Sequence, residues 1–322
     1  MTPDILFADY FRDWVETYKL GSVRPCTLQK YRCTANHLKN IAPDIKMIDL
    51  NKKIYQQIIN RFAETHAKNT THDFHNQIKS SIHDALDEGL VIRNPTLKVV
   101  IKGTPDKQYN KYIGAVEAGQ LLRKLQLTKP IIMQYDITHS RAREMTTNWD
   151  WLIFLCLGTG IRYSEALGLT PADFDFQNKM LRISKTYDYK FTFKTVNETK
   201  SKSSKRHISI DSNIAQMFSE ALLGLDPDAL IFVPEGQRVF NSTVNNRLKT
   251  LCKHCKIPKI SVHALRHTHA SILLYNGISI NAISKRLGHS KVSITQDVYL
   301  HIIKELEEKD NFAIAQTMEM LY

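Results

Sequence analysis

The sequence predicts a mainly helical protein of two domains, with a small antiparallel β-sheet in the second domain (α+β). Apolar residues recur every three to four positions along most of the chain, which is typical of amphipathic helices. Three short segments instead alternate apolar and polar residues, as strands do. The length of 322 residues suits two domains of roughly 150 residues each.

The first domain, at 1–102, is predicted to be a helical bundle. Apolar stripes at helical spacing run through residues 7–18, 28–38, 54–62 and 74–86. Asn51 suits the start of the third helix, and Gly89 suits the end of the fourth. Four short helices with short connections form a compact bundle.

A polar stretch with Gly and Pro, at 103–112, is predicted to be the linker to a second domain at 113–322. Segment 127–148 fits no regular element and is expected to be a loop or an irregular insertion. An amphipathic run at 302–318 predicts a C-terminal tail helix. Helices are predicted at 115–126, 149–158, 212–223, 241–255, 263–275 and 280–287, and strands at 180–184, 189–193 and 206–210.

The charge of the chain points to a polyanionic partner. There are 44 Lys and Arg residues against 32 Asp and Glu, a net charge of +12, although such a balance also occurs in proteins that bind no nucleic acid. Residues 238–266 hold seven basic side chains and no acidic one.

No apolar run approaches the roughly 20 residues of a membrane span. The absence of a leader and the five unpatterned cysteines indicate a cytoplasmic protein.

Four local patterns in the second half carry chemistry, and their order is more informative than any one of them. They are, in chain order, TGIRYSEALGLT at 159–170, KSKSSKRHISI at 200–210, HALRHTHAS at 263–271, and LGHS at 287–290 followed by Tyr299. Attack on a phosphodiester builds negative charge on the non-bridging oxygens, and two guanidiniums that fork onto these oxygens stabilise it. Arg162 and Arg266 are the candidates. On spacing alone, a surface pair of Arg162 with Glu165 is the simpler interpretation of the first pattern.

The ordered set resembles the tyrosine recombinases, or phage integrase family, and most closely the integrases of Gram-positive phages and conjugative transposons. The resemblance implies a helical SAM-like core-binding domain followed by a catalytic domain. It also implies the nucleophile, Tyr299, which would form a 3′-phosphotyrosyl bond during site-specific recombination through a Holliday junction. A phenolate suits this role, since it is also an acceptable leaving group.

The resemblance assigns roles to the other residues of the patterns. Lys200, with Lys202 as the alternative, would protonate the leaving 5′ oxygen, and His263 would assist proton transfer. His289 would hydrogen-bond the phosphate, and Glu165 would orient the neighbouring basic groups. His267 and His269 are expected to be structural.

The expected partner is double-stranded DNA at core recombination sites, bound by a homo-oligomer, a tetramer in this family. In related recombinases a C-terminal tail packs into a neighbouring protomer, which is favoured here over a tail folded on its own domain. Accessory DNA-bending or excision factors are further partners by resemblance, whereas a membrane is not. The basic residues expected to contact DNA are Lys205, Arg206, Arg247, Lys249 and Lys253.

No metal and no cofactor are expected. Cys252 and Cys255, with His254 between them, offer zinc-type ligands, but their helical spacing indicates packing. Energy conserved in the phosphotyrosine would make nucleotide hydrolysis unnecessary.

Two other functions stay open: strand relaxation of the type IB topoisomerase kind, and sequence-specific DNA binding without catalysis. Many related integrases carry a further N-terminal domain that binds arm sites, whereas Phe7 here already lies in the first predicted core-binding helix. Either the protein lacks this domain or the sequence is a truncated piece of a longer chain.

Overall fold

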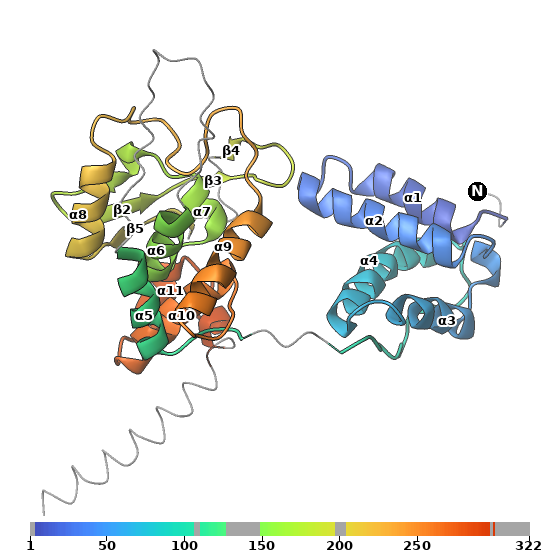
Figure 1. Ribbon diagram of the computed structural model, residues 1–322. Helices are drawn as coiled ribbons and strands as arrows, with labels where there is room; N and C mark the ends of the chain where they lie inside the picture. The colour runs from blue at the N-terminus through green and yellow to red at the C-terminus, as the bar shows by residue number, and fades with distance from the viewer. Residues whose placement is uncertain (1–3, 106–109, 127–148, 197–203, 297–298, 300–322) are drawn as a thin grey trace, which may run out of the picture. The chain divides into compact units, whose positions relative to one another are not determined.

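The computed structural model describes residues 4–105, 110–126, 149–196, 204–296 and 299. The chain divides into two compact units, Met1–Gln108 and Tyr109–Tyr322. Figure 1 shows the helices and strands of both units. Each unit has a hydrophobic core of its own. The units are helical apart from small antiparallel sheets in the second, so the predicted fold class is confirmed.

The described residues of the first unit form four α-helices and one short 3₁₀ helix. Asn51 begins the third helix, because its side-chain oxygen accepts the backbone N–H groups of Lys53 and Ile54. Gly89, with φ of +73°, follows the end of the fourth. The elements are α1 (Phe7–Tyr18), α2 (Pro25–Ile41), η1 (Met47–Asp49), α3 (Lys52–Ala63) and α4 (Lys68–Asp87).

Aromatic side chains fill the core of this unit. Phe7, Phe11 and Trp14 lie on the buried face of α1. The indole Nε1 of Trp14 donates to Asp84 Oδ2 on α4 at 2.6 Å, which satisfies its buried N–H. The apolar stripes of the sequence are therefore core faces.

The second unit is built around α6, which is buried on nearly all sides. Helices α5, α9 and α10 pack around it. Asp150, near the start of α6, is buried and accepts two hydrogen bonds of 2.6 Å from Arg247 on α9. The described helices of this unit include α5 (Ala115–Gln126), α6 (Trp149–Thr159), α7 (Tyr163–Leu167), η2 (Pro171–Asp173), α8 (Ser212–Ala221), α9 (Asn241–His254), α10 (Val262–Tyr275) and α11 (Ile280–Leu287).

A three-stranded antiparallel sheet flanks these helices, with the order β1 (Phe174–Asp175), β2 (Met180–Ile183) and β5 (Arg206–Ser209). Leu181 pairs with Phe174 on one side and with Ile208 on the other. Helix α8 lies beside the sheet in Figure 1, and its Phe218 stacks on Phe174 with ring centroids 5.2 Å apart. A separate two-stranded hairpin pairs β3 (Thr186–Tyr187) with β4 (Thr195–Val196).

The predicted strand at 189–193 is wrong. This segment is the turn of the β3–β4 hairpin, and Phe193 has a φ of +52°. The Asp188 carboxylate accepts the backbone N–H groups of Lys190, Phe191 and Thr192. A carboxylate that satisfies three successive backbone donors favours a turn over an extended strand.

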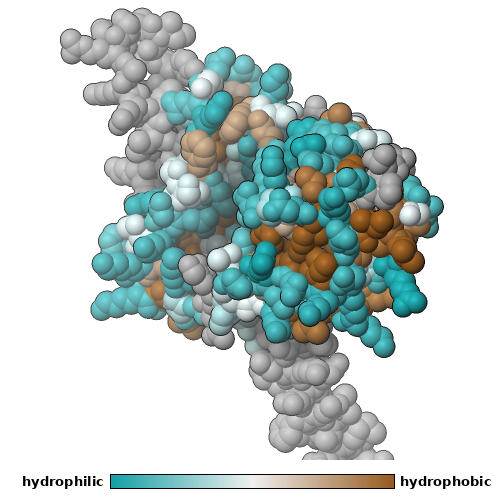
Figure 2. Space-filling model, turned by 90° about the vertical axis from the view of Figure 1, so that its right-hand side faces the viewer, coloured by the Kyte–Doolittle hydropathy of each residue, from teal (hydrophilic) through white to brown (hydrophobic). Residues whose placement is uncertain are grey.

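Two predictions lie outside the described residues: the irregular segment at 127–148 and the tail helix at 302–318. No helix in the described part of the chain is long and apolar enough to cross a bilayer. The face of the molecule in Figure 2 is mostly hydrophilic, with apolar side chains gathered in patches.

Gly103 belongs structurally to the first unit, although the sequence placed it in the linker. Thr104 forms a parallel bridge with Ala67, and its N–H donates to His66 O at 2.9 Å. A Cβ at Gly103 would overlap the backbone of Ala67 and Lys68. Only glycine allows this close approach of two backbone segments.

Replacing Gly103 with Ala should therefore lower the free energy of unfolding of the first unit by about 1–3 kcal/mol. Hydrogen–deuterium exchange of the full chain should show faster exchange of the α1–α4 amides. Gly119→Ala is the control, since its Cβ would meet only Arg123 Nη1 at 3.5 Å. It should leave the first unit unchanged and slow exchange in α5. Equal α1–α4 protection in wild type and Gly103→Ala would contradict the packing described.

Candidate active site

Arg162 lies directly before α7, in the turn that follows α6. Its backbone N–H donates to Glu165 Oε2 at 2.9 Å, which fixes the start of α7. Its guanidinium donates from Nη1 to Glu165 Oε1 at 2.7 Å. The same group donates to the backbone oxygens of Leu287 and Gly288, each at 3.4 Å. Arg162 thus faces the C-terminal end of α11, 125 positions further along the chain.

Arg266 reaches the same point from α10. Its side chain is buried, with Nη2 donating to Leu287 O at 2.6 Å and Nη1 donating to Gly160 O at 2.8 Å. Burial and the nearby Arg162 lower the pKa of Arg266 to about 9, which leaves the group charged at neutral pH. The structure therefore brings the two predicted arginines together around one backbone oxygen.

The geometry of this meeting point depends on Gly288. This residue ends α11 in the left-handed conformation, with φ of +67°, which glycine adopts without strain. Its conformation turns the chain so that the last carbonyls of α11 face the arginines. The negative end of a helix dipole is a favourable place for cations.

Glu165 is the counter-charge of the site. Its side chain is 1% exposed and pairs with Arg162 on one side and with Arg206 Nη2, at 3.0 Å, on the other. Burial would raise the pKa of Glu165, but the charge and hydrogen bonds of Arg206, together with Arg162, lower it to about 2. Glu165 is therefore ionised, and the surface pair suggested by spacing alone is in fact a buried network.

Arg206, predicted as a DNA contact, lies inside this network. Its side chain is 7% exposed, and its Nε donates to Arg286 O at 2.6 Å in addition to the Glu165 contacts. The structure thus places Arg206 next to the predicted catalytic arginines rather than on the outer surface.

His289 follows α11 immediately. Its Nδ1 lies 2.8 Å from the hydroxyl oxygen of the buried Thr295. Burial and the cations Arg266, Arg162 and Arg206 lower the pKa of His289 to about 4, so the ring is neutral at pH 7. When the threonine hydroxyl donates to Nδ1, Nε2 carries the ring hydrogen and can serve as a donor.

His263 and His267 lie one turn apart on α10, with ring centroids 5.0 Å apart. Burial and the charges of Arg266 and Arg162 lower the pKa of His263. His267, which the sequence left as structural, has its Nδ1 at 3.1 Å from the hydroxyl of Tyr299. The structure thus places the predicted nucleophile within hydrogen-bond distance of a histidine that the sequence predicted to be structural.

Tyr299 is buried at 2% exposure in a small apolar cluster with Leu274, Ile283 and Leu287. Burial raises the pKa of its phenol to about 12, against an opposing effect of Arg266. The phenol is therefore protonated at neutral pH.

His269 and Arg286 link α10 to the sheet. His269 Nδ1 lies 3.0 Å from Leu157 O, and Arg286 Nε donates to His269 Nε2 at 2.9 Å. Arg286 also donates to Ser209 O on β5 at 3.1 Å. A neutral His269 with its hydrogen on Nδ1 satisfies both bonds, which agrees with a positioning role for this residue.

The remaining predicted residues lie elsewhere. Lys200 and Lys202 are outside the described residues. Lys205, Lys249 and Lys253 are exposed. Arg247 is engaged with Asp150 through two hydrogen bonds and is 40% exposed.

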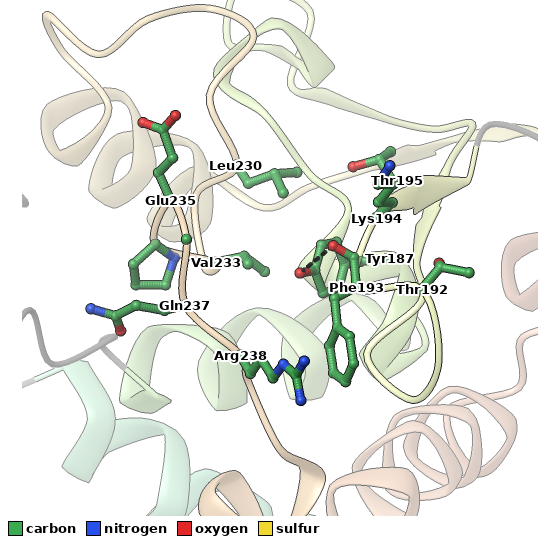
Figure 3. A pocket seen from close by; sticks show the side chains of 12 residues that line it. Tyr187, Thr192, Phe193, Lys194, Thr195, Leu230, Val233, Glu235, Gln237 and Arg238 are labelled. Carbon is green, nitrogen blue, oxygen red and sulfur yellow. Dashed lines mark hydrogen bonds between the residues drawn. The ribbon is translucent and has the colours of Figure 1, made fainter.

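A cavity of about 460 Å³ adjoins the β3–β4 hairpin and includes none of the described predicted site residues. Figure 3 shows Tyr187, Phe193 and Arg238 around it, with Tyr187 donating to Phe193 O at 2.9 Å. The Arg238 guanidinium lies 4.5 Å from the ring centroid of Phe193, a cation–π contact. These contacts fix the hairpin whose second strand leads into 197–203.

The cysteines show no sign of a metal-binding arrangement. Cys252 belongs to the core of the second unit, and the partly buried Cys255 packs against that core. Across the part of the chain that the structure describes, no three His, Cys, Asp or Glu side chains come close enough to hold a metal ion.

Sequence reasoning missed Arg206, Arg286 and Thr295 as members of the site. Arg206 is adjacent to a predicted DNA-contact lysine in a basic run, so its pairing with Glu165 had no local signal. Arg286 precedes LGHS directly, but its bonds cross to α10 and β5. Only tertiary structure reveals these partners.

Comparison with known proteins gives the same family in both units. Residues 131–305 match the phage integrase family, and residues 6–101 match the phage integrase SAM-like domain. A XerC-like tyrosine recombinase of Caldanaerobacter subterraneus is 26% identical over 329 residues, covering 93% of this chain and 80% of the relative. The integrase of Staphylococcus phage L54a is 26% identical over 325 residues, covering 92% of this chain and 90% of the relative.

Solved structures share the fold. The integrase of transposon Tn1549, in complex with a circular intermediate DNA, matches with a TM-score of 0.72 at 17% identity, covering 92% of this chain and 95% of that one. A lambda integrase dimer bound to a core site matches with a TM-score of 0.65 at 13% identity, covering 91% and 77%. The family match covers more than half of the sequence, and both arginines of the resemblance meet at one point; the chain belongs to the phage integrase family and is a site-specific recombinase of the tyrosine type.

Proposed function

We propose that this recombinase cleaves and rejoins double-stranded DNA through a 3′-phosphotyrosyl intermediate and a Holliday junction. The observation that carries the proposal is the convergence of Arg162 and Arg266, which donate to the same oxygen of Leu287. Two guanidiniums aimed at one point suit the non-bridging oxygens of a phosphodiester under attack. His289 lies close enough to both arginines for their charges to lower its pKa.

In the proposed reaction, the Tyr299 oxygen attacks phosphorus and the bond to the 5′ oxygen breaks. Lys200, or Lys202 in its place, donates a proton to that oxygen. Because the phosphotyrosyl bond keeps the energy of the broken linkage, a 5′ hydroxyl can attack it and rejoin a strand without a cofactor. Glu165 holds Arg162 and Arg206 in place.

The proposed partner is DNA carrying core recombination sites, bound in the bacterial cytoplasm. The first unit would bind the core site, supported by its match to the SAM-like domain of phage integrases. The DNA-bound state of the Tn1549 and lambda integrases supports the same partner. Assembly as a tetramer through the C-terminal tail, and accessory bending or excision factors, belong to this proposal as well.

A nicked suicide duplex carrying the recombination site from the DNA flanking the reading frame should trap a covalent protein–DNA adduct. Tyr299→Phe should abolish the adduct and leave DNA binding intact, because it removes only the nucleophilic oxygen. Tyr275→Phe, at a residue 42% exposed at the end of α10, is the control and should form the adduct. Denaturing gel electrophoresis detects it. A wild-type chain that binds the site specifically but forms no adduct would be a DNA-binding regulator instead.

Replacing Glu165 with Gln should lower the free energy of unfolding by about 3 kcal/mol at pH 7, because Arg162 and Arg206 lose a buried counter-charge. The folded pKa of about 2 lies below the ordinary value of 4.5. The ionised carboxylate therefore stabilises the fold above about pH 4.5, and this stabilisation is lost as the pH falls towards 2.

Urea unfolding at several pH values measures this effect. The difference between wild type and Glu165→Gln should be largest above pH 5 and should shrink as the pH falls. Glu235→Gln, on an exposed loop, is the matched control and should cost less than about 0.5 kcal/mol. A difference that stays constant from pH 7 to pH 2.5 would rule out charge pairing as its cause.

Lys249 and Lys253 are both exposed on α9 and are proposed phosphate contacts. Replacing both with Ala should reduce the slope of log K against log salt by about 2, since each phosphate contact adds about 0.9. Titrations of specific DNA at several salt concentrations measure this slope. An unchanged slope would mean that these lysines do not face the backbone of DNA.

A further inference from the structure

Tyr299 and His267 form a hydrogen-bonded pair that the family resemblance did not lead us to expect. The His267 Nδ1 and the Tyr299 hydroxyl oxygen are 3.1 Å apart, with ring centroids at 5.9 Å. Tyr299 is packed in its apolar cluster, so the phenol is held against the imidazole. This distance lies within the reach required of a general base.

The direction of the hydrogen bond follows from the surroundings of His267. The titratable groups that face it are His263 and Arg266 on α10, Lys111 on the segment before α5, His289 after α11, and Tyr299 itself. Burial and the charges of His263, Arg266 and Lys111 lower the pKa of His267 to about 4, so its ring is neutral. Between a neutral phenol and a neutral imidazole, the phenol is the stronger donor and the imidazole nitrogen the stronger acceptor.

We propose that His267 is the general base of the cleavage step, taking the phenolic proton of Tyr299 as its oxygen attacks phosphorus. This inference rests on the proposed function and assigns a catalytic residue to its first step. His267 Nδ1 lies within hydrogen-bond distance of the reacting oxygen, whereas the ring contact described for His263 is with His267.

The bond from the Tyr299 oxygen to phosphorus forms while the phenolic proton moves to His267 Nδ1, which produces an imidazolium. The bond from phosphorus to the 5′ oxygen breaks, and that oxygen takes a proton from Lys200 or Lys202. In rejoining, the 5′ hydroxyl returns its proton to the lysine, and the imidazolium returns its proton to the departing phenolate.

The low basicity of His267 in the DNA-free protein has a chemical consequence. A phenol with a pKa of about 12 does not transfer its proton to an imidazole with a pKa of about 4 in the resting state. Transfer becomes favourable only as the phenol oxygen bonds to phosphorus and loses its basicity. The negative charge of bound DNA also raises the pKa of an adjacent imidazole.

The test is single-turnover cleavage of the nicked suicide duplex by the full chain. The cleavage rate is measured with ordinary tyrosine and with fluorinated tyrosine at position 299. His267→Ala should cleave about 100-fold more slowly than wild type, the usual range for loss of a general base. Its rate should rise about tenfold per pH unit, because hydroxide then has to remove the proton. The phenol of fluorinated tyrosine is more acidic and needs a base less. His267→Ala with fluorinated tyrosine at position 299 should therefore cleave at least tenfold faster than His267→Ala with ordinary tyrosine.

Two controls separate proton transfer from other defects. His267→Asn keeps a polar group near the phenol but provides no base, so it should show the same fluorotyrosine recovery if folding is intact. A substrate with sulfur in place of the bridging 5′ oxygen needs no general acid. That substrate should rescue Lys200→Ala and leave the His267→Ala defect in place.

The outcomes distinguish this inference from the proposed function. Wild-type rates in His267→Ala, or a defect of equal size with both tyrosines, would overturn His267 as the base. Fluorotyrosine recovery in His263→Ala but not in His267→Ala would assign the role to His263 and overturn it too. A wild-type chain that forms no adduct would instead overturn the proposed function, and the base with it.

Discussion

A single buried carboxylate holds the candidate site together. Glu165 is 1% exposed and neutralises Arg162 and Arg206, while Arg266 lies close enough for its charge to be felt. Three guanidiniums crowded into one site would repel each other and would be costly to desolvate without such a counter-charge. The network joins α7 to β5 through Glu165, and Arg162 and Arg266 connect it to the end of α11.

The fold supplies these groups from distant parts of the second unit. Helix α6 provides the buried support against which α10 packs, so Arg266 and His267 project from a rigid helix. Helix α11 ends at Gly288 and presents its last carbonyls to both arginines. His289 follows Gly288 directly and Tyr299 lies ten positions later, so the proposed nucleophile and one proposed phosphate contact lie on one short stretch of chain. Rigid elements position reacting groups more accurately than loops do.

The sequence predicted the helices well because the apolar periodicity of most of them is local, and α5 begins where that periodicity does. It failed at 189–193, where Asp188 satisfies three backbone donors and overrides an alternating pattern. The meeting of Arg162 with Arg266 followed only from the family resemblance, because no local rule joins residues more than 100 positions apart. The contacts of Arg206 with Glu165 and of His267 with Tyr299 had no signal in sequence at all, since both are tertiary.

The carbonyl oxygen of Leu287, which both arginines contact, connects the proposed phosphate-binding arginines to the chain segment that carries Tyr299. Arg162 and Arg266 donate hydrogen bonds to the last turn of α11, and Tyr299 lies 12 residues after Leu287. A displacement of the backbone at the end of α11 would therefore also move the carbonyl oxygens that the two guanidiniums contact. The placement of both arginines is in this way tied to the segment that carries His289 and Tyr299.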